Sequence, residues 1–212
     1  MSESIKAFFK TLRYSFHILV RPIDGFWDMK HERRGSLPAA LLLYVLYGIT
    51  YVMQQQLTGF LFNHNNIEQM NILAELGGAL LIPALWCIAN WSLTTLMDGN
   101  GKMRDIMMAT GYALLPMILI NVLLIGMSYI LSLEEGSIYT FFSGFQIVWT
   151  LLLALIGTMS VHEFTFGKAV GTSLLSVVAM LVIIFLVMLA VSVIQQIVGF
   201  GYSLFKEVSF RF

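Results

Sequence analysis

Five long runs of apolar residues alternate with short polar segments along this chain. Each run reaches the roughly 20 residues that a helix needs to cross the hydrocarbon core of a bilayer. Backbone groups inside that core cannot bond to water, so each run must be helical. The pattern therefore predicts an all-α integral membrane protein with five transmembrane helices, at about residues 37–62, 72–97, 106–132, 139–161 and 169–198.

A different pattern precedes the first run. Within residues 2–21, apolar side chains recur every three or four positions, and basic side chains occupy the opposite face of the predicted helix. Such a helix buries its apolar face at the acyl boundary and holds its cations against anionic headgroups. We therefore expect a cytoplasmic interfacial amphipathic helix that ends near Pro22, with packing against the membrane bundle as the alternative. The basic residues expected to bind lipid headgroups are Lys6, Lys10, Arg13 and Arg21.

The distribution of basic residues predicts how the chain is oriented. Seven of the 12 Lys and Arg residues lie before the first run, three lie after the second and fourth runs, and none lies after the first and third. Cytoplasmic loops of membrane proteins carry an excess of Lys and Arg. We therefore expect a cytoplasmic segment at residues 1–36, a membrane domain at residues 37–198 and an exterior C-terminal tail at residues 199–212.

The composition leaves little room for a separate water-soluble domain. Hydrophobic residues make up 58% of the chain and charged residues 11%, whereas about a quarter of a typical soluble domain is charged. The formal net charge is zero, and we expect no nucleic-acid partner. The single cysteine, Cys87, lies in the second run, so no disulfide forms within the chain and a packed thiol is expected.

Residues that interrupt the apolar runs are the candidates for function inside the membrane. Pro83 and Pro116 are predicted to kink the second and third helices, because proline removes a backbone hydrogen bond. Asn90 and Asn121 either bond across neighbouring helices or line a path for a solute. Both interpretations stay open at this point.

The polar segment after the second run predicts a tight inner turn rather than a calcium loop, which needs further oxygen ligands. His162, next to Glu163 in the last inner loop, lacks the second histidine that a zinc hydrolase needs four residues later. We therefore expect no catalytic site, no metal and no cofactor. The inner-turn residues of interest are Asp98, Lys102, Arg104 and Asp105.

Three patches of sequence resemble the Yip1 family of small five-span membrane proteins. They are Arg21–Lys30 running into Gly35–Pro38, the turn Asp98–Asp105, and Gly111–Pro116 in the third run. The resemblance implies five spans and a cytoplasmic N-terminus, and for eukaryotic members a role in vesicle traffic with Rab-type GTPases. This chain does not have the long acidic N-terminal region of those members, so it resembles the compact bacterial branch, which implies the plasma membrane.

Two functions of different classes stay open. The short loops and the basic helix favour a non-enzymatic membrane scaffold or accessory protein of the Yip1 type. Its partners are expected to be anionic lipids of the inner leaflet and other membrane proteins, including further copies of itself. The alternative is a small transporter or channel subunit whose path runs near the kinked second and third helices.

Overall fold

The computed structural model describes residues 3–63, 65 and 69–209, without the side chains of residues 3–7, 204, 208 and 209. Helix makes up 85% of the chain, and the described residues contain no strand, which confirms the all-α prediction. The α-helices are α1 (Glu3–Val20), α2 (Pro22–His31), α3 (Leu37–Leu57), α4 (Ile72–Leu96), α5 (Met103–Ala113), α6 (Leu115–Ser128), α7 (Gly136–His162) and α8 (Phe166–Ser209), with a 3-10 turn, η2 (Leu133–Glu135), before α7.

Five segments are long and apolar enough to cross a membrane, as predicted. The first two are single helices, α3 and α4, and the third is formed by α5 and α6 together. The fourth consists of η2 and α7, and the last is α8. Their bounds are Leu37–Leu57, Ile72–Leu96, Met103–Ser128, Leu133–His162 and Phe166–Glu207.

Local sequence explains where the first two spans begin. The Ser36 hydroxyl accepts a hydrogen bond from the backbone N–H of Ala39 at 3.4 Å, and Pro38 follows in the first turn of α3. The Asn71 side chain accepts from the N–H groups of Leu73 and Ala74 at 3.0 and 3.2 Å at the start of α4. Both caps satisfy N–H groups that have no partner inside the helix.

The two prolines in the spans have different settings. Pro116 occupies the second position of α6, directly after the break at Leu114 that separates α5 from α6. Proline is well tolerated at a helix start, so this position differs from the kink predicted inside a continuous helix. Pro83 lies inside α4, which continues through it without a break, and it is buried.

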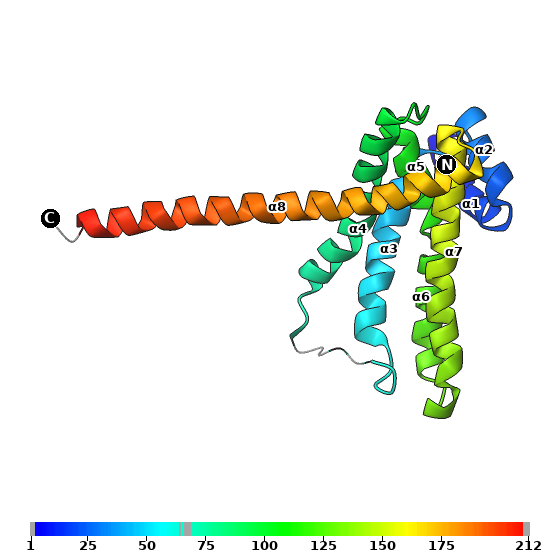
Figure 1. Cartoon of the computed structure of the whole chain (residues 1–212). Coiled ribbons are helices and arrows are strands. Elements are labelled where there is room, and N and C mark those ends of the chain that lie inside the picture. The colour runs from blue at the N-terminus through cyan, green and yellow to red at the C-terminus, as the bar shows by residue number, and fades with distance from the viewer. Residues whose placement is uncertain (1–2, 64, 66–68, 210–212) are drawn as a thin grey trace.

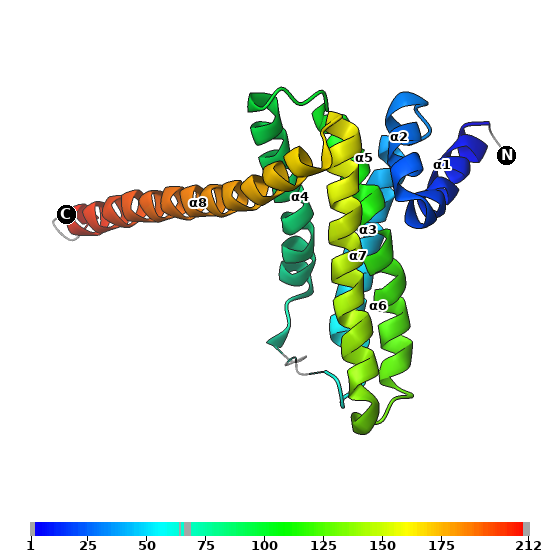
Figure 2. The same cartoon turned by 45° about the vertical axis from the view of Figure 1, so that its right-hand side comes forward.

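Helices α3 to α7 form a bundle, and the two views in Figure 1 and Figure 2 show which segments share an end of it. One end carries α1, α2, the turn 97–102 and the turn 163–165. These segments were predicted to be cytoplasmic from their Lys and Arg residues, so we call this the cation-rich end. The segments 58–71 and 129–135 lie at the opposite end.

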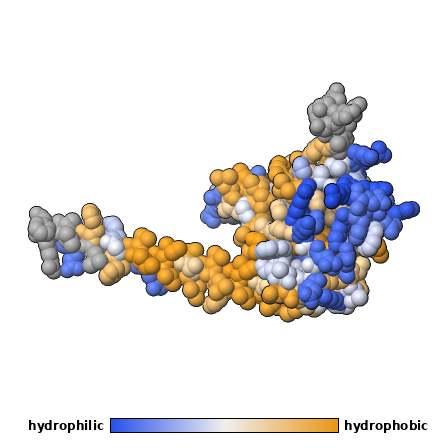
Figure 3. All heavy atoms as spheres, turned by 90° about the horizontal axis from the view of Figure 1, so that it is seen from above, coloured by the Kyte–Doolittle hydropathy of each residue, from blue (hydrophilic) through white to orange (hydrophobic). Residues whose placement is uncertain are grey.

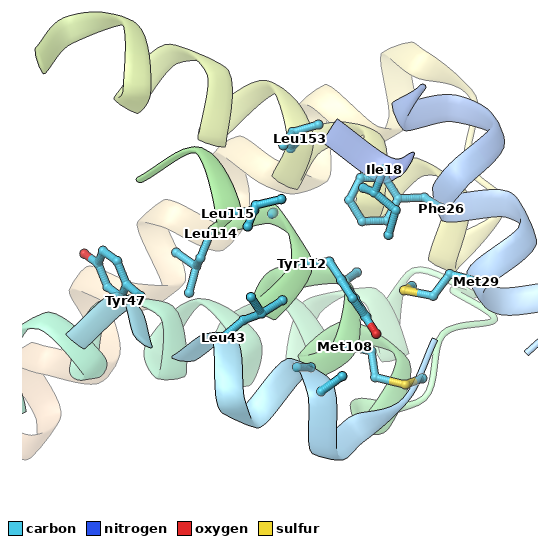
Figure 4. Packing of buried hydrophobic residues seen from close by; sticks show 14 of the residues in the cluster. Ile18, Phe26, Met29, Leu43, Tyr47, Met108, Tyr112, Leu114, Leu115 and Leu153 are labelled. Carbon is cyan, nitrogen blue, oxygen red and sulfur yellow. The ribbon is translucent and has the colours of Figure 1, made fainter. Parts of the chain in front are cut away.

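The centre of the bundle is built around Tyr112 of α5, whose side chain is fully buried. Figure 4 shows its ring between Leu43 of α3 on one side and Phe26 and Met29 of α2 on the other. The Tyr112 hydroxyl donates to the backbone carbonyl of Thr11 at 3.2 Å, so the polar end of the side chain is also satisfied. Helix α5 therefore connects the membrane bundle to the N-terminal helices.

Helix α8 differs from every other span, because it projects sideways from the bundle (Figure 1, Figure 2). Its first turns pack at the bundle, where Ala169, Thr172 and Ser176 are fully buried, and most of the described residues beyond are exposed. Figure 3 shows a largely hydrophobic surface along its length. The helix continues to Ser209, so the segment predicted as a tail from residue 199 begins as helix.

Candidate functional site

Glu163 connects three segments at the cation-rich end. One carboxylate oxygen, Oε1, accepts from Lys30 Nζ of α2 at 2.8 Å and lies 3.3 Å from His31 Nε2. The other oxygen accepts from the Asn100 side-chain amide at 3.0 Å. The hydrogen bond from Lys30, then that from Asn100, lower the pKa of Glu163 from its ordinary value of 4.5 to about 2. This carboxylate is therefore ionised at neutral pH.

The backbone at Glu163 makes this arrangement possible. Glu163 ends α7 with a left-handed conformation, φ 57°, so the chain turns sharply between α7 and α8. Lys30 also donates to the carbonyl of Val161 at 2.8 Å. This is one of the last carbonyls of α7, which have no partner inside the helix. A cation at a helix C-terminus is favourable, and Lys30 thus holds α2 against the end of α7.

His162, the residue before Glu163, is 1% exposed. Its Nδ1 accepts from the backbone N–H of Gly101 at 3.3 Å, which leaves the proton of the neutral ring on Nε2. Nε2 then donates to the Asn90 side-chain oxygen at 3.1 Å. The imidazole therefore bridges α4, the inner turn and α7.

The placement of His162 corrects one prediction from the sequence. We expected it in the last inner loop, whereas it is the last residue of α7 and is buried. The apolar run of this span ends one residue earlier, at Val161, and a histidine in that position is easily taken for a loop residue. Its close approach to the inner turn depends on Gly101, where an added Cβ would lie 2.6 Å from the imidazole.

The two intramembrane asparagines have different settings. Asn90 is fully buried, and its side-chain oxygen bonds across helices to His162, while its amide nitrogen is buried without a hydrogen-bond partner among the described residues. A cavity of about 10 Å³ adjoins Asn90 and His162, room for about one water molecule. Asn121 is 2% exposed on α6. The structure therefore brings Asn90, but not Asn121, into the cluster at the cation-rich end.

Cys87 is packed as predicted, with 2% of its surface exposed. Its sulfur lies 3.4 Å from the Tyr44 hydroxyl and 3.4 Å from the Thr110 hydroxyl. The Tyr44 hydroxyl also donates to the carbonyl of Met107 at 3.1 Å. These contacts join α3, α4 and α5, and they give the thiol a structural setting.

Two of the predicted inner-turn residues, Asp98 and Asp105, shape the turn itself. Asp98 has a left-handed backbone, φ 57°, as the chain leaves α4. The Asp105 side chain accepts from the backbone N–H of Lys102 at 3.3 Å at the start of α5. Lys102 and Arg104 are exposed. Asn100 and Gly101, which the sequence analysis treated only as turn residues, provide the contacts to Glu163 and His162.

Helix α1 has one face on the bundle and another that is exposed. Ile18 is fully buried, and the Tyr14 hydroxyl donates to the carbonyl of Gly25 in α2 at 2.7 Å. The packing alternative is seen in these contacts, whereas the interfacial interpretation stays a prediction that the exposed apolar side chains allow. The exposed side comprises Phe9, Phe16 and Val20, which are 56%, 52% and 76% exposed, together with Lys10, Arg13 and Arg21; Lys6 lies in α1, but its side chain is outside the described part.

Within the residues that the structure describes, no group of three or more His, Cys, Asp or Glu side chains is placed to hold a metal ion. The helices of the bundle, the five spans and the polar cluster at one end define a polytopic α-helical membrane protein.

The comparison with protein families specifies the class. The Yip1 domain matches residues 16–202, which is most of the chain, and the protein therefore belongs to the Yip1 family. Members of this family are generally non-enzymatic membrane proteins. No curated protein and no solved structure matches the chain. The match begins inside α1 and ends inside α8, so it includes α2 and both turns of the cation-rich end but only the last part of α1.

Proposed function

We propose that this protein is a non-enzymatic membrane scaffold or accessory protein, which binds anionic lipid and other membrane proteins at its cation-rich end. The observation that carries this proposal is that α1 has one side packed against the protein and one side exposed. Buried contacts at Tyr14, Ser15 and Ile18 fix the helix on the bundle. Its free side then presents apolar groups beside cations, which is the composition of a helix at a membrane surface.

The proposed orientation follows from the same charges. Residues 3–36, the inner turn and the start of α8 lie at one end of the bundle and contain ten of the 12 Lys and Arg residues. The positive-inside rule places such an end in the cytoplasm. In our proposal the N-terminus is cytoplasmic, α8 crosses a bacterial plasma membrane, and the C-terminus is outside.

The length of α8 supports this crossing. Its 44 residues span about 66 Å at 1.5 Å per residue, and the hydrocarbon core is about 30 Å thick. The helix is thus more than long enough to cross, but here it projects sideways from the bundle, so the proposed crossing requires α8 to turn towards the direction of the other spans. Its surface is apolar on all sides in its central part, so lipid is the medium that this helix fits.

A transporter is less well supported by this structure. The asparagine that was a candidate for solute contact, Asn90, already bonds to His162. The cavity beside it holds about 10 Å³, which is the volume for about one water molecule. We therefore propose a binding function and not a transport function.

Lipid binding is tested by neutralising the exposed cations of α1 together with Arg21, the residue that follows it. The triple variant Lys10→Gln, Arg13→Gln, Arg21→Gln, purified in mild detergent, should lose phosphatidylglycerol relative to phosphatidylcholine, measured by mass spectrometry of the retained lipid. Each cation near an anionic surface contributes about 1 kcal/mol, so we expect a loss on the order of 10- to 100-fold at low salt and less at high salt.

The matched control is Lys102→Gln, Arg104→Gln, which removes exposed cations from the inner turn at the same end. It should retain more phosphatidylglycerol than the triple variant. Equal retention by the triple variant and the unmodified protein would remove the lipid-binding part of the proposal. The scaffold part is tested by crosslinking in native membranes, where absence of any stable adduct with itself or another membrane protein contradicts it.

A further inference from the structure

A cleft of about 520 Å³ lies between α2 and the end of α7, and no residue of α1 lines it. This volume is in the range of pockets that bind small ligands, roughly 300–1,000 Å³. The cleft is lined by Ile23, Asp24 and Trp27 of α2 and by Met159, Ser160, Glu163 and Phe164 of α7 and the turn that follows it.

Ser160 in this lining has no side-chain hydrogen bond to another described residue. The residue is 6% exposed, but its hydroxyl oxygen is not one of the enclosed side-chain atoms that have no partner, so the hydroxyl keeps some access from outside the protein. The hydroxyl therefore offers a hydrogen bond to a ligand oxygen in the cleft.

The charge of the lining is negative. Asp24 is exposed and has no ion pair with another described residue, whereas Glu163 is already paired with Lys30. The lining contains no Lys, Arg or His. Its two aromatic rings already have partners, because Phe164 lies under the Lys168 ammonium at 4.1 Å and Trp27 stacks on His31. The exposed carboxylate of Asp24 is therefore the group in the lining that can pair with an ammonium group.

The position of the cleft indicates which ammonium compound is available. It lies where the fourth span ends, at His162, and therefore at the level of the lipid headgroups. Ile23 and Trp27 of α2 are 60% and 51% exposed, and Phe166 at the start of α8 is 66% exposed. Aromatic and apolar side chains exposed at this level contact lipid in membrane proteins.

We propose that this cleft binds a phospholipid whose headgroup ends in a primary ammonium, of the phosphatidylethanolamine class. The ammonium pairs with Asp24, the Ser160 hydroxyl donates to a phosphate or ester oxygen, and the exposed Ile23 and Trp27 contact the upper part of an acyl chain. This site is separate from the anionic-lipid surface of α1 and has the opposite charge preference.

The test uses the full chain in mild detergent or nanodiscs, exchanged into equal amounts of phosphatidylethanolamine and phosphatidylglycerol with the same acyl chains. Native mass spectrometry then counts each lipid that stays bound. Asp24→Asn should lower phosphatidylethanolamine retention at least about fivefold, because a charge-assisted contact is lost. Phosphatidylglycerol retention, which reports on α1, should not change.

Three further variants keep the test specific. Ser160→Ala should give a smaller loss, and Asp24→Glu should restore retention because it keeps the charge. Glu134→Gln, an exposed acid at the opposite end, is the matched control and should behave as the unmodified protein. Equal phosphatidylethanolamine retention by Asp24→Asn and the unmodified protein overturns the proposal. It is also overturned if Asp24→Asn instead abolishes binding of a lysine-rich peptide, because the cleft would then take a basic protein segment.

Discussion

The third span and the last helix are both apolar, yet they have opposite positions in the molecule. In the most apolar part of the third span, 67% of residues are buried by protein, whereas in the most apolar part of α8 none is. The third span also contains a small residue, Gly111, and two residues with hydroxyl groups, Thr110 and Tyr112, all buried at the centre. Helix α8 consists mainly of large aliphatic residues and is exposed along most of its length.

This difference shows that apolarity does not indicate burial by protein in a membrane. Lipid tails are as apolar as leucine, so a helix gains little by moving a leucine from lipid into protein. Close packing and hydrogen bonds select the central span instead, and small residues permit both. The central span should therefore be sensitive to changes in shape, and α8 should tolerate them.

The largest difference is expected at two glycines. A Cβ at Gly111 would lie 2.9 Å from the Cβ and 3.0 Å from the carbonyl oxygen of Ala40, while nothing lies within 4 Å at Gly199. Gly111→Val should lower the free energy of unfolding by about 3 kcal/mol, because backbone atoms of α3 cannot move aside easily. Gly199→Val should be nearly neutral. Unfolding by denaturant in detergent micelles compares them, and equal stability of the two variants contradicts the packing shown here.

A smaller contrast is expected for two leucines. Leu124 of the third span is fully buried, whereas Leu186 of α8 is 56% exposed. Leu124→Ala leaves a cavity and should cost about 2 kcal/mol, since the cavity term persists where the water-transfer term is small. Leu186→Ala should cost less than about 0.5 kcal/mol, within the range of ordinary surface changes. The same unfolding assay applies, and a larger loss for Leu186→Ala would place α8 inside a protein interface.

These two pairs also show what the sequence predicts and what it does not. The five apolar runs predicted the spans, because length and hydrophobicity are sufficient to identify membrane helices. They did not predict which span is central, since that depends on close approaches such as the one between Gly111 and Ala40. The break at Leu114 was also missed, because proline alone does not distinguish a kink from a helix start.

The next prediction concerns the polar contacts where α7 meets α8. Asn90→Leu removes the acceptor of the His162 imidazole N–H and should lower the free energy of unfolding by about 1 kcal/mol. The control is Thr95→Val on the exposed side of α4, whose hydroxyl bonds only to the Trp91 carbonyl of its own helix. It should have a smaller effect. Stability of Asn90→Leu equal to that of the control would show that the cross-helix bond contributes nothing measurable.

The smallest expected effect is the pH dependence from Glu163. Its pKa is lowered from 4.5 to about 2 by Lys30 and Asn100, so the folded state favours the ionised form. The stabilisation is fully present above pH 4.5 and is lost as the pH falls from 4.5 towards 2. Unfolding of the unmodified protein should therefore become easier over this range more steeply than unfolding of Glu163→Gln. Parallel curves for the two proteins contradict this role of Glu163.

The candidate site was less predictable than the fold. Asn90 was identified because an amide inside an apolar run is unusual. His162 and Glu163 were considered together only as a metal or catalytic pair, and their partners are distant in sequence: Lys30 at 133 residues from Glu163 and Asn90 at 72 residues from His162. No spacing rule connects positions so far apart. The available signal was topological, because the predicted inner segments had to meet at one end of the bundle.

The measurement that tests the central claim most directly is the accessibility of single cysteines introduced at both ends of the bundle and in α8. In a Cys87→Ser background, a membrane-impermeant maleimide is applied to intact cells carrying Asn100→Cys, Ser137→Cys or Ser203→Cys. The account predicts labelling at residues 137 and 203 and protection at residue 100 until the membrane is opened. Labelling of residue 100 in intact cells, or the same protection at residues 100 and 203, would contradict the orientation and the crossing by α8.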